Sequence, residues 1–374
     1  MRQKLMIIGA GSLGGWVLEL LVRIPGLSRL VDIVVCDVDE ELGIRRVNSA
    51  LLGAQFFDIY PAITFKKMDL FEKDSAAEIL AKERPTVIFS NVTLQSWWVL
   101  YTLPQETCLE LDKAKFGPWL PMHLALVYNL MQAIKSAGIN CHVLNASFPD
   151  AVNCILEKKG FPVTAGIGNI DNLAPMVRLG VARKLDVPVA DVDLYLYLPH
   201  FVSSTVRRDG STEGAPYLAR AFVCGEDVSG NIDFDGIFKE AKGELRHPEG
   251  NGLHPVVGSS AVRCIMALLK DSREKVHSPG PAGLPGGYPV RLSASRGAEV
   301  LLPGLSLSEA VEVNKQAQVF DGIKEIKEDG TTVFTDWAYE VMKNALAYDC
   351  RELKPEDSEE RARELQQKFT AYVK

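Results

Sequence analysis

The sequence predicts an α/β protein that begins with a doubly wound parallel sheet, and three observations lead to this prediction. Short apolar runs alternate with helical patterns through residue 150. A glycine-rich turn joins the first apolar run to the first helical pattern, in the stretch MIIGAGSLGGWVLELL at residues 6–21. An aspartate ends the second apolar run. Alternation of strand and helix favours parallel strands that are covered by helices on both faces.

The glycine-rich turn has the spacing of a dinucleotide-binding turn. Gly9, Gly11 and Gly14 follow the pattern G-x-G-x-x-G between a predicted strand and a predicted helix. The first glycine permits the sharp turn, the second lets a pyrophosphate approach the backbone, and the third lets the helix pack on the strand. Ser12 and Leu13 lie between the second and third glycines and belong to the same predicted cofactor site. Ordinary tight turns also have this spacing, so a second signal has to decide.

The second signal is an acidic residue downstream of the turn. The stretch VDIVVCDVDEE reads as a buried strand at residues 33–36 that ends in Asp37, 23 residues after Gly14. An acid about 20 residues past the third glycine holds the ribose of NAD and repels the 2′-phosphate of NADP. We therefore expect NAD rather than NADP. Asn91, at the end of the strand PTVIFSNV, is expected at the same edge of the sheet.

Composition excludes several classes of function. The 374 residues are 47% hydrophobic and 24% charged, which is typical of a globular protein of two domains. A net charge of −7 argues against nucleic acid or an anionic membrane as the main partner. We see no signal peptide and no apolar run near the roughly 18 residues of a membrane span, so we expect a cytoplasmic protein. Seven cysteines without a C-x-x-C pair indicate reduced, packing cysteines, and we predict no metal site.

The remaining elements follow the same alternation. We expect a dinucleotide-binding domain at residues 1–165 and a catalytic domain at 166–374 that ends in extra helices. Residues 93–121 have no clean period and are expected to form a long loop over the crevice. The other predicted elements are strands in 62–70, 85–92, 140–150 and 191–204, the last ending at His200, and helices at 76–84, 122–138, 172–187, 258–271 and 354–373. Residues 225–236 are expected to form a hairpin or surface loop, and the turn-rich residues 278–287 an insertion within the domain.

Several stretches together resemble the lactate and malate dehydrogenase family, in the family's order, over most of residues 4–325. The stretches IIGAGSLGG and VVCDVDEE resemble its nucleotide-binding unit, and VLNASFPDAVNCIL resembles its S-N-P-V-D segment with one extra residue before Pro149. GIGNIDN and VARKLDVPVADVDLYLYLPHFVSS are similar to the segments that carry its catalytic residues, and GYPVRLSASRGAEVLLPGLSLSEAVEVNKQAQ is similar to its closing strands and helix. The resemblance implies a Rossmann-type domain followed by an α+β catalytic domain, and a homodimer or homotetramer.

The resemblance also implies a mechanism. His200 would take the hydroxyl proton of a secondary alcohol while hydride passes to the nicotinamide of NAD, and Asp171 would orient the imidazole. Asn145 would hydrogen-bond the substrate or the nicotinamide. We expect His123, Trp98 and His254 in the substrate pocket, where His123 would be a second titrating group. Ordinary packing or capping remains an alternative for these residues.

The sequence departs from the family at its substrate clamp. The family holds a substrate carboxylate with an arginine three residues after the aspartate, where this chain has Ala174. The aromatic residues of 93–121 either stack on a bulkier substrate or pack the loop against the body. Cations elsewhere that are candidates to reach the pocket are Lys113, Lys115, Arg178, Arg207, Arg208 and Arg263.

We therefore expect an NAD-dependent dehydrogenase that acts on a small-molecule alcohol and its ketone. The alternatives are an opine- or saccharopine-type dehydrogenase that reduces an imine, an NAD-dependent glycosidase that uses Cys154 and His200 with a metal, and a dinucleotide-binding protein without catalysis.

Overall fold

The first part of the chain forms one six-stranded parallel sheet, as predicted. The computed structural model describes residues 2–373. The strand order is β3-β2-β1-β4-β5-β6, so the order reverses between β1 and β4, where ligands bind in sheets of this type. The strands are β1 Gln3–Ile8, β2 Val31–Asp37, β3 Ile63–Lys67, β4 Val87–Ser90, β5 His142–Asn145 and β6 Ala165–Gly166.

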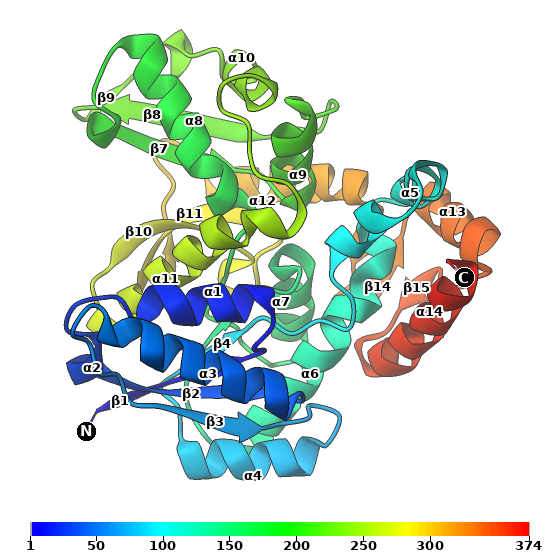
Figure 1. Cartoon of the computed structure of the whole chain (residues 1–374). Helices are drawn as coiled ribbons and strands as arrows, with labels where there is room; N and C mark the ends of the chain where they lie inside the picture. Colours follow the sequence, from blue (N-terminus) through cyan, green and yellow to red (C-terminus); the bar gives the residue numbers. More distant parts are fainter. Residues whose placement is uncertain (1, 374) are drawn as a thin grey trace.

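Helices cover both faces of this sheet (Figure 1). The strands are buried on both faces because they are nearly continuous apolar runs; Ile7 pairs with Val35 on one side and Phe89 on the other, and all three are buried. The helices of this part are α1 Ser12–Leu21, α2 Leu27–Leu30, α3 Glu40–Gln55, α4 Lys73–Glu83, α6 Leu120–Ala137 and α7 Pro149–Lys158. Helix α6 ends at Gly138, which adopts the left-handed conformation that such a helix end requires.

The prediction of one long loop at residues 93–121 was wrong. This segment, called the aromatic segment below, contains a 3₁₀ helix at Trp97–Thr102, helix α5 at Gln105–Asp112 and a 3₁₀ helix at Gly117–Trp119, and α6 already starts at Leu120. These helices are too short to show a period, and Pro104 stands at the N-cap of α5.

The middle of the chain builds a second, antiparallel sheet, which Figure 1 shows at the top of the molecule, away from the first sheet. It consists of β7 Val192–Tyr197, β8 Leu218–Val223 and β9 Glu226–Asp227, flanked by α8 Ile170–Leu185, α9 His200–Asp209 and α10 Phe234–Lys239. The strand predicted to end at His200 ends at Tyr197, and His200 is the first residue of α9. Pro199 separates the two elements. The pairing of β8 with β9 confirms a hairpin near residue 225.

A third, three-stranded sheet follows helix α11 His254–Lys270. Its strands are β10 Glu274–Pro279, β11 Gly287–Ser293 and β12 Gly297–Val300, and residues 278–287 connect β10 to β11, which confirms an insertion within the domain. By length and composition, Gly250–Lys270 is apolar enough to cross a membrane, contrary to our reading that no run comes near that length. Its buried face packs into the core with α1, however, where a Cβ on Gly258 would lie 3.3 Å from Leu20 and 3.4 Å from Trp16.

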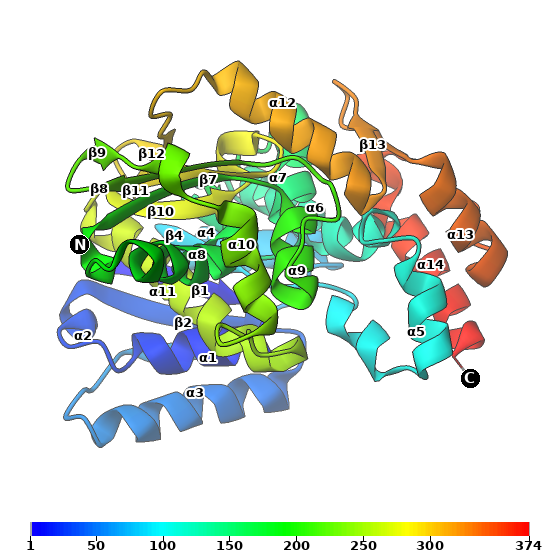
Figure 2. The ribbon, with the colours of Figure 1, turned by 90° about the horizontal axis from the view of Figure 1, so that it is seen from above.

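The C-terminal elements pack against α5 and α6, at the side of the molecule (Figure 2). Helix α14 packs on α6, and the ring of Phe369 meets that of Trp119 at 5.4 Å. The elements are α12 Leu307–Gln318, β13 Ile323–Ile326, β14 Thr332–Phe334, α13 Asp336–Leu346, β15 Glu352–Leu353 and α14 Ser358–Tyr372, the last confirming the predicted amphipathic helix. A domain boundary at residue 165 remains a prediction. The end of the chain shares a hydrophobic core with the first part of the chain, although the prediction assigned the two to different domains.

Candidate functional site

The glycine-rich turn has the three local geometries that a dinucleotide site needs. Gly9 has φ +102°, a conformation that side chains rarely adopt. A Cβ on Gly14 would lie 1.9 Å from the carbonyl oxygen of Gly9, so only glycine lets α1 pack so close to β1. A Cβ on Gly11 would have no neighbour within 4 Å, which leaves open space over the first turn of α1. This open space is where the backbone of α1 can receive a phosphate group.

Asp37 lies beside this turn, at the end of β2. Its carboxylate accepts hydrogen bonds from the backbone N–H of Ala10 at 2.5 Å and of Asp39 at 2.9 Å. Each carboxylate oxygen has a second acceptor position, and the side chain lines the large cavity described below. Asp37 therefore keeps an acceptor position that faces the cavity beside the turn.

Asn91 and His254 contact the glycine-rich turn through hydrogen bonds. The amide of Asn91 donates to the carbonyl oxygens of Ile8 and Gly9, at 2.9 Å each. His254 Nδ1 lies 2.7 Å from Ser12 Oγ, and burial lowers the pKa of this histidine. We predicted His254 in the substrate pocket, but it lies at the glycine-rich turn because it is the first residue of α11, which packs on α1.

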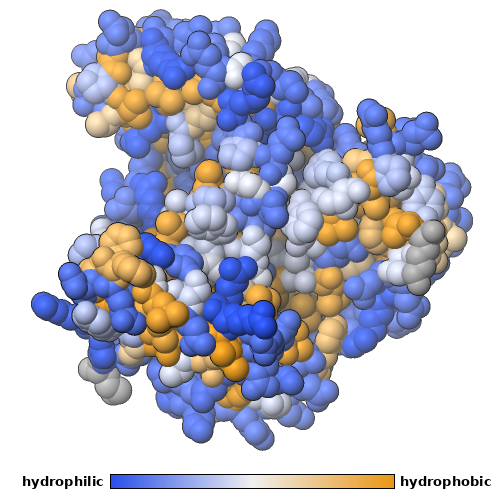
Figure 3. All heavy atoms as spheres, in the orientation of Figure 1, coloured by the Kyte–Doolittle hydropathy of each residue, from blue (hydrophilic) through white to orange (hydrophobic). Residues whose placement is uncertain are grey.

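One cavity of about 1120 Å³ connects the glycine-rich turn to His200. Figure 3 shows the surface hollowed where the lobes of the molecule meet. Ten of our predicted site residues line the cavity: Gly9, Gly11, Ser12, Leu13, Asp37, Asn91, Trp98, His123, His200 and His254. Three do not: Gly14, Asn145 and Asp171.

His200 is held by Asp321, so its predicted pairing with Asp171 was wrong. The Nδ1 of His200 lies 2.9 Å and 3.1 Å from the two carboxylate oxygens of Asp321, and both side chains are buried. Asp321 ends the 3₁₀ helix Val319–Asp321 after α12. Asp171 instead accepts a hydrogen bond from the backbone N–H of His277 in β10, at 3.1 Å, and burial raises its pKa.

A second carboxylate, Asp150, lies near His200 and was not predicted. Burial raises the pKa of Asp150 to about 6, while the charge of His200 opposes this shift. One oxygen accepts a hydrogen bond from the amide of Asn169, and the other is buried with no partner among the described residues. Asn169 and Phe148 precede α8 and α7, and they have φ values of +46° and +43°. Such strained backbone at non-glycine residues is frequent at functional sites.

Aromatic side chains enclose the imidazole of His200. The ring centroid of Phe116 lies 4.5 Å from that of His200 and 4.8 Å from that of His123. Phe148 lies 5.3 Å from His200. These rings cover part of the imidazole, which leaves His200 9% exposed, and a less polar surrounding strengthens its hydrogen bond to Asp321.

His123 is a neutral hydrogen-bonding group, and our expectation of a second titrating group was wrong. Its Nδ1 lies 3.2 Å from the hydroxyl oxygens of Thr93 and Ser147. Burial, followed by the charge of His200, lowers the pKa of His123 to about 3. The side chain therefore stays uncharged at neutral pH while it lines the cavity.

Asn145 has an internal role instead of the predicted contact with a ligand. Its amide donates to the Ser147 carbonyl oxygen and to the Asn153 side chain, and its oxygen accepts from the Ser147 backbone N–H. It is fully buried and fixes the turn that carries Ser147 and Phe148. Ser147 and Phe148, which follow in this turn, line the cavity, and Asn145 does not.

The aromatic segment packs against the body, as one of the two sequence alternatives had it, and it also lines the cavity, while stacking on a substrate stays a prediction. Trp119 is buried and packs the segment against the body. Trp98 and Tyr101 line the cavity with part of their surface exposed. The segment therefore both supports and covers the space beside His200.

Of the candidate cations, only Arg207 and Arg208 line the large cavity. Arg178 donates to the carbonyl oxygen of Val192, and Arg263 pairs with Glu274 outside the cavity. Cys154, proposed for the glycosidase alternative, does not line the cavity. Burial raises its pKa to about 11, so its thiol stays protonated.

Comparison with known proteins identifies the fold. No family model and no curated protein matches the sequence. The structure is similar to the malate dehydrogenase of Plasmodium falciparum, with a TM-score of 0.58, 14% identity, and coverage of 91% of this chain and 100% of that one. It is also similar to the malate dehydrogenase of Cryptosporidium parvum (TM-score 0.57, 18% identity, 85% and 96% covered). A third similar structure is the lactate dehydrogenase of Eimeria maxima with NADH and oxamate (TM-score 0.58, 16% identity, 85% and 92% covered). The chain therefore has the fold of the lactate and malate dehydrogenases, as its sequence stretches implied.

Proposed function

We propose that this protein is an NAD-dependent oxidoreductase that interconverts a secondary alcohol and its ketone. The main support is that one cavity joins the glycine-rich turn to the buried pair of His200 and Asp321. A cavity with a dinucleotide turn at one end and an oriented acid–base group at the other suits hydride chemistry.

The residues present fit NAD. The open space over Gly11 suits the pyrophosphate, and Asp37 suits the adenosine ribose. A carboxylate at this position disfavours the 2′-phosphate of NADP. When bound, the nicotinamide supplies the hydride acceptor or donor. The structures described as lactate dehydrogenase with NADH and as lactate dehydrogenase with lactic acid and NAD, from Eimeria and Cryptosporidium, have the same fold.

The chain's own residues handle the proton. The Nδ1–H of His200 donates to Asp321, so its Nε2 is free to take the hydroxyl proton of the alcohol. The carboxylate of Asp321 stabilises the imidazolium that forms. The rings of Phe116 and Phe148 exclude water from this transfer. In the reverse direction, the imidazolium returns its proton to the carbonyl oxygen.

The first experiment separates binding from turnover. Purified protein is titrated with NADH and NADPH by nicotinamide fluorescence, and ketones, keto acids and imines are screened for NADH oxidation. We expect NADH to bind more tightly than NADPH, and we expect reduction of a carbonyl that is lost in His200→Ala. The matched control is His142→Gln, because the side chain of His142 contacts Thr164 outside the cavity.

The other outcomes select other functions. Binding of NADH without turnover of any compound would favour the non-catalytic protein, and a requirement for an amine would favour the opine-type enzyme. Loss of activity on chelation would favour the glycosidase. If neither dinucleotide binds, the assignment of the glycine-rich turn is wrong.

We also propose that the chain forms a homodimer or homotetramer. Leu52 on α3 and Phe56 and Tyr60, which follow α3, are 62%, 90% and 70% exposed, and Figure 3 shows hydrophobic surface in the region of α1 and α3. Exposed apolar patches of this kind mark association surfaces. Light scattering on the purified 41.1 kDa chain tests this proposal: a mass of two or four chains supports it, and the mass of one chain contradicts it.

A further inference from the structure

The part of the cavity beyond His200 is lined with cations. Arg207 and Arg208 come from α9, and Lys242 and Arg246 come from the segment after α10. Glu249 is the carboxylate of the same wall. Cations gathered in one cavity are unexpected in a chain of net charge −7. Lys242 donates to the carbonyl oxygen of Arg208 at 3.0 Å, and the Nε of Arg246 donates to that of Gly243 at 3.3 Å, so these two exposed side chains are engaged with the backbone.

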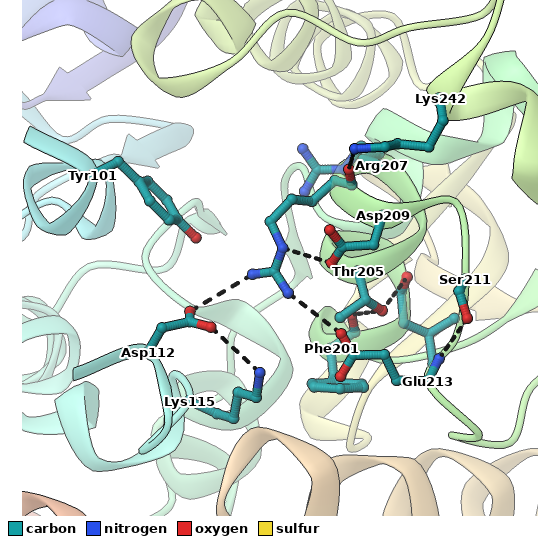
Figure 4. Close-up of polar contacts among 12 residues, drawn as sticks. Tyr101, Asp112, Lys115, Phe201, Thr205, Arg207, Asp209, Ser211, Glu213 and Lys242 are labelled. Carbon is teal, nitrogen blue, oxygen red and sulfur yellow. Dashed lines mark hydrogen bonds and ion pairs between the residues drawn. The ribbon is translucent and has the colours of Figure 1, made fainter. Parts of the chain in front are cut away.

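Arg208 is neutralised by carboxylates. It donates to Asp209 at 2.6 Å and lies within 3.6 Å of Asp112 and 3.5 Å of Glu213. Asp112 also pairs with Lys115, so the network joins α5 to α9, as Figure 4 shows for the labelled residues. Arg208 therefore has a structural role and offers little charge to a ligand.

Arg207 is different, because its terminal nitrogens have no partner within residues 2–373. Its Nε donates to the carbonyl oxygen of Ser203 at 3.0 Å, which fixes the plane of the guanidinium. Arg207 forms no ion pair with a carboxylate of residues 2–373, and Figure 4 draws no dashed line from Arg207 to a carboxylate. Burial lowers the pKa of Arg207 to about 10, so the side chain stays charged at neutral pH. A fixed, charged guanidinium with free N–H groups can donate two hydrogen bonds to the oxygens of a carboxylate or phosphate.

His247 points to the same ligand independently. Its Nε2 is buried and has no hydrogen-bond partner among the described residues. Burial, followed by the charge of Arg207, lowers the pKa of His247 to about 4, so this imidazole is neutral and can donate from Nε2. A buried polar atom without a partner needs an explanation, and a bound group would provide one.

Helix α9 carries both His200 and Arg207, so it fixes how far this site lies from the reacting centre. His200, Ser204 and Arg207 lie on one face of α9, because four and seven residues are close to one and two full turns. All three line the cavity. At 1.5 Å per residue, Arg207 is displaced roughly 10 Å along the helix from His200. An anion bound at Arg207 would therefore lie several ångströms away from the substrate carbon that reacts at His200.

We propose that Arg207 and His247 form an anion subsite that holds a carboxylate or phosphate group of the substrate, remote from the carbon that exchanges hydride. This proposal rests on the proposed function, and it gives a reason for the alanine at position 174: the anion is held at the distal end of the substrate.

A binding experiment tests the subsite without turnover. Glutarate and inorganic phosphate are titrated into wild-type protein by calorimetry, with and without saturating NADH. We expect one of the two anions to bind, and its identity distinguishes a carboxylate from a phosphate site. Arg207→Met should weaken binding about 10- to 100-fold, the effect of losing charged hydrogen bonds. The matched control Arg263→Met, which loses a charge outside the cavity, should bind as the wild type does.

The proposal also predicts a signal in the unmodified protein. Glutarate or phosphate should shift the imidazole resonances of His247, identified by their absence in His247→Gln. This measurement replaces the variant test if Arg207→Met does not fold.

The results separate this proposal from the proposed function. Equal binding of the anion by Arg207→Met and wild type would overturn the subsite. The subsite would also be overturned if Arg207→Met bound NADH more weakly than wild type but bound the anion equally well. If no anion binds while NADH does, the subsite fails alone. If the anion binds in an Arg207-dependent manner and NADH does not bind, the subsite stands and the dinucleotide function fails.

Discussion

The two ends of the cavity are built in different ways. At the glycine-rich turn, Gly9, Gly11 and Gly14 act through backbone geometry, and Asp37 ends the neighbouring strand. At the other end, the imidazole of His200 meets a carboxylate 121 residues further along the chain. The first end is specified by spacing within a short stretch. The second exists only when distant elements pack together.

The two ends of the cavity therefore depend on different features of the molecule. The turn depends on positions where a side chain would clash, since a Cβ on Gly14 would lie 1.9 Å from Gly9. The His200 end depends on which carboxylate packing brings to the imidazole. The predictions that follow test whether the two ends act separately.

The largest expected effect is at the His200 end. Asp321→Asn removes the carboxylate that fixes the tautomer of His200, and kcat on the substrate found in the screen should fall roughly 10²- to 10⁴-fold, the range of an acid–base contribution. Asp171→Asn should leave kcat unchanged, because Asp171 contacts the backbone of His277. Nitrogen NMR of His200 gives a second readout, since the tautomer should change only in Asp321→Asn.

Two outcomes would contradict this assignment. One is a full rate with an unchanged His200 tautomer in Asp321→Asn. The other is a loss of rate in Asp171→Asn with an intact fold, which would restore the partner that the sequence resemblance implied.

A smaller effect is expected at the glycine-rich turn. Asp37→Arg should weaken NADH binding about 10- to 100-fold, because it removes acceptors for the ribose. It should also reduce the preference for NADH over NADPH. Fluorescence titration measures both constants, and Glu41→Arg makes the same change of charge on the exposed part of α3.

Anion binding at Arg207 is a second readout for Asp37→Arg, because the two ends of the cavity are separate. Because Asp37 lies at the ribose end, glutarate or phosphate binding at Arg207 should be unaffected in Asp37→Arg. Unchanged NADH affinity would remove the ribose assignment.

The smallest effect concerns stability and pH at the His200 end. Burial raises the pKa of Asp150 to about 6, above its ordinary value of 3.8. Between these two pH values the folded protein binds more protons than the unfolded chain, so Asp150 makes the free energy of unfolding fall as pH rises. Relative to wild type, Asp150→Asn should therefore gain on the order of 1–3 kcal/mol between pH 4 and pH 7.

Denaturant unfolding of both proteins at several pH values measures this gain. Asp336→Asn, which alters an exposed ion pair, is the control. A constant difference in stability across the pH range would show that Asp150 ionises in the folded state as it does in the unfolded chain.

The sequence predicted the sheet and the glycine-rich turn at its edge well, for a physical reason. Continuous apolar runs such as those around Ile7 and Val35 are buried on both faces wherever they pair, so they indicate parallel strands. The aromatic segment was predicted poorly, because helices of one or two turns are too short to show a period. Asp321 was missed because no local pattern distinguishes it from other aspartates.

The sequence by itself determined the elements and the glycine-rich turn with Asp37, since these follow from backbone conformation and burial within short stretches. The tertiary structure decided the chemistry of the other end. It paired His200 with Asp321, kept His123 neutral through burial, and left Arg207 without a carboxylate. Partners and pKa values depend on which side chains meet after folding, and the distance along the chain does not encode which side chains these are.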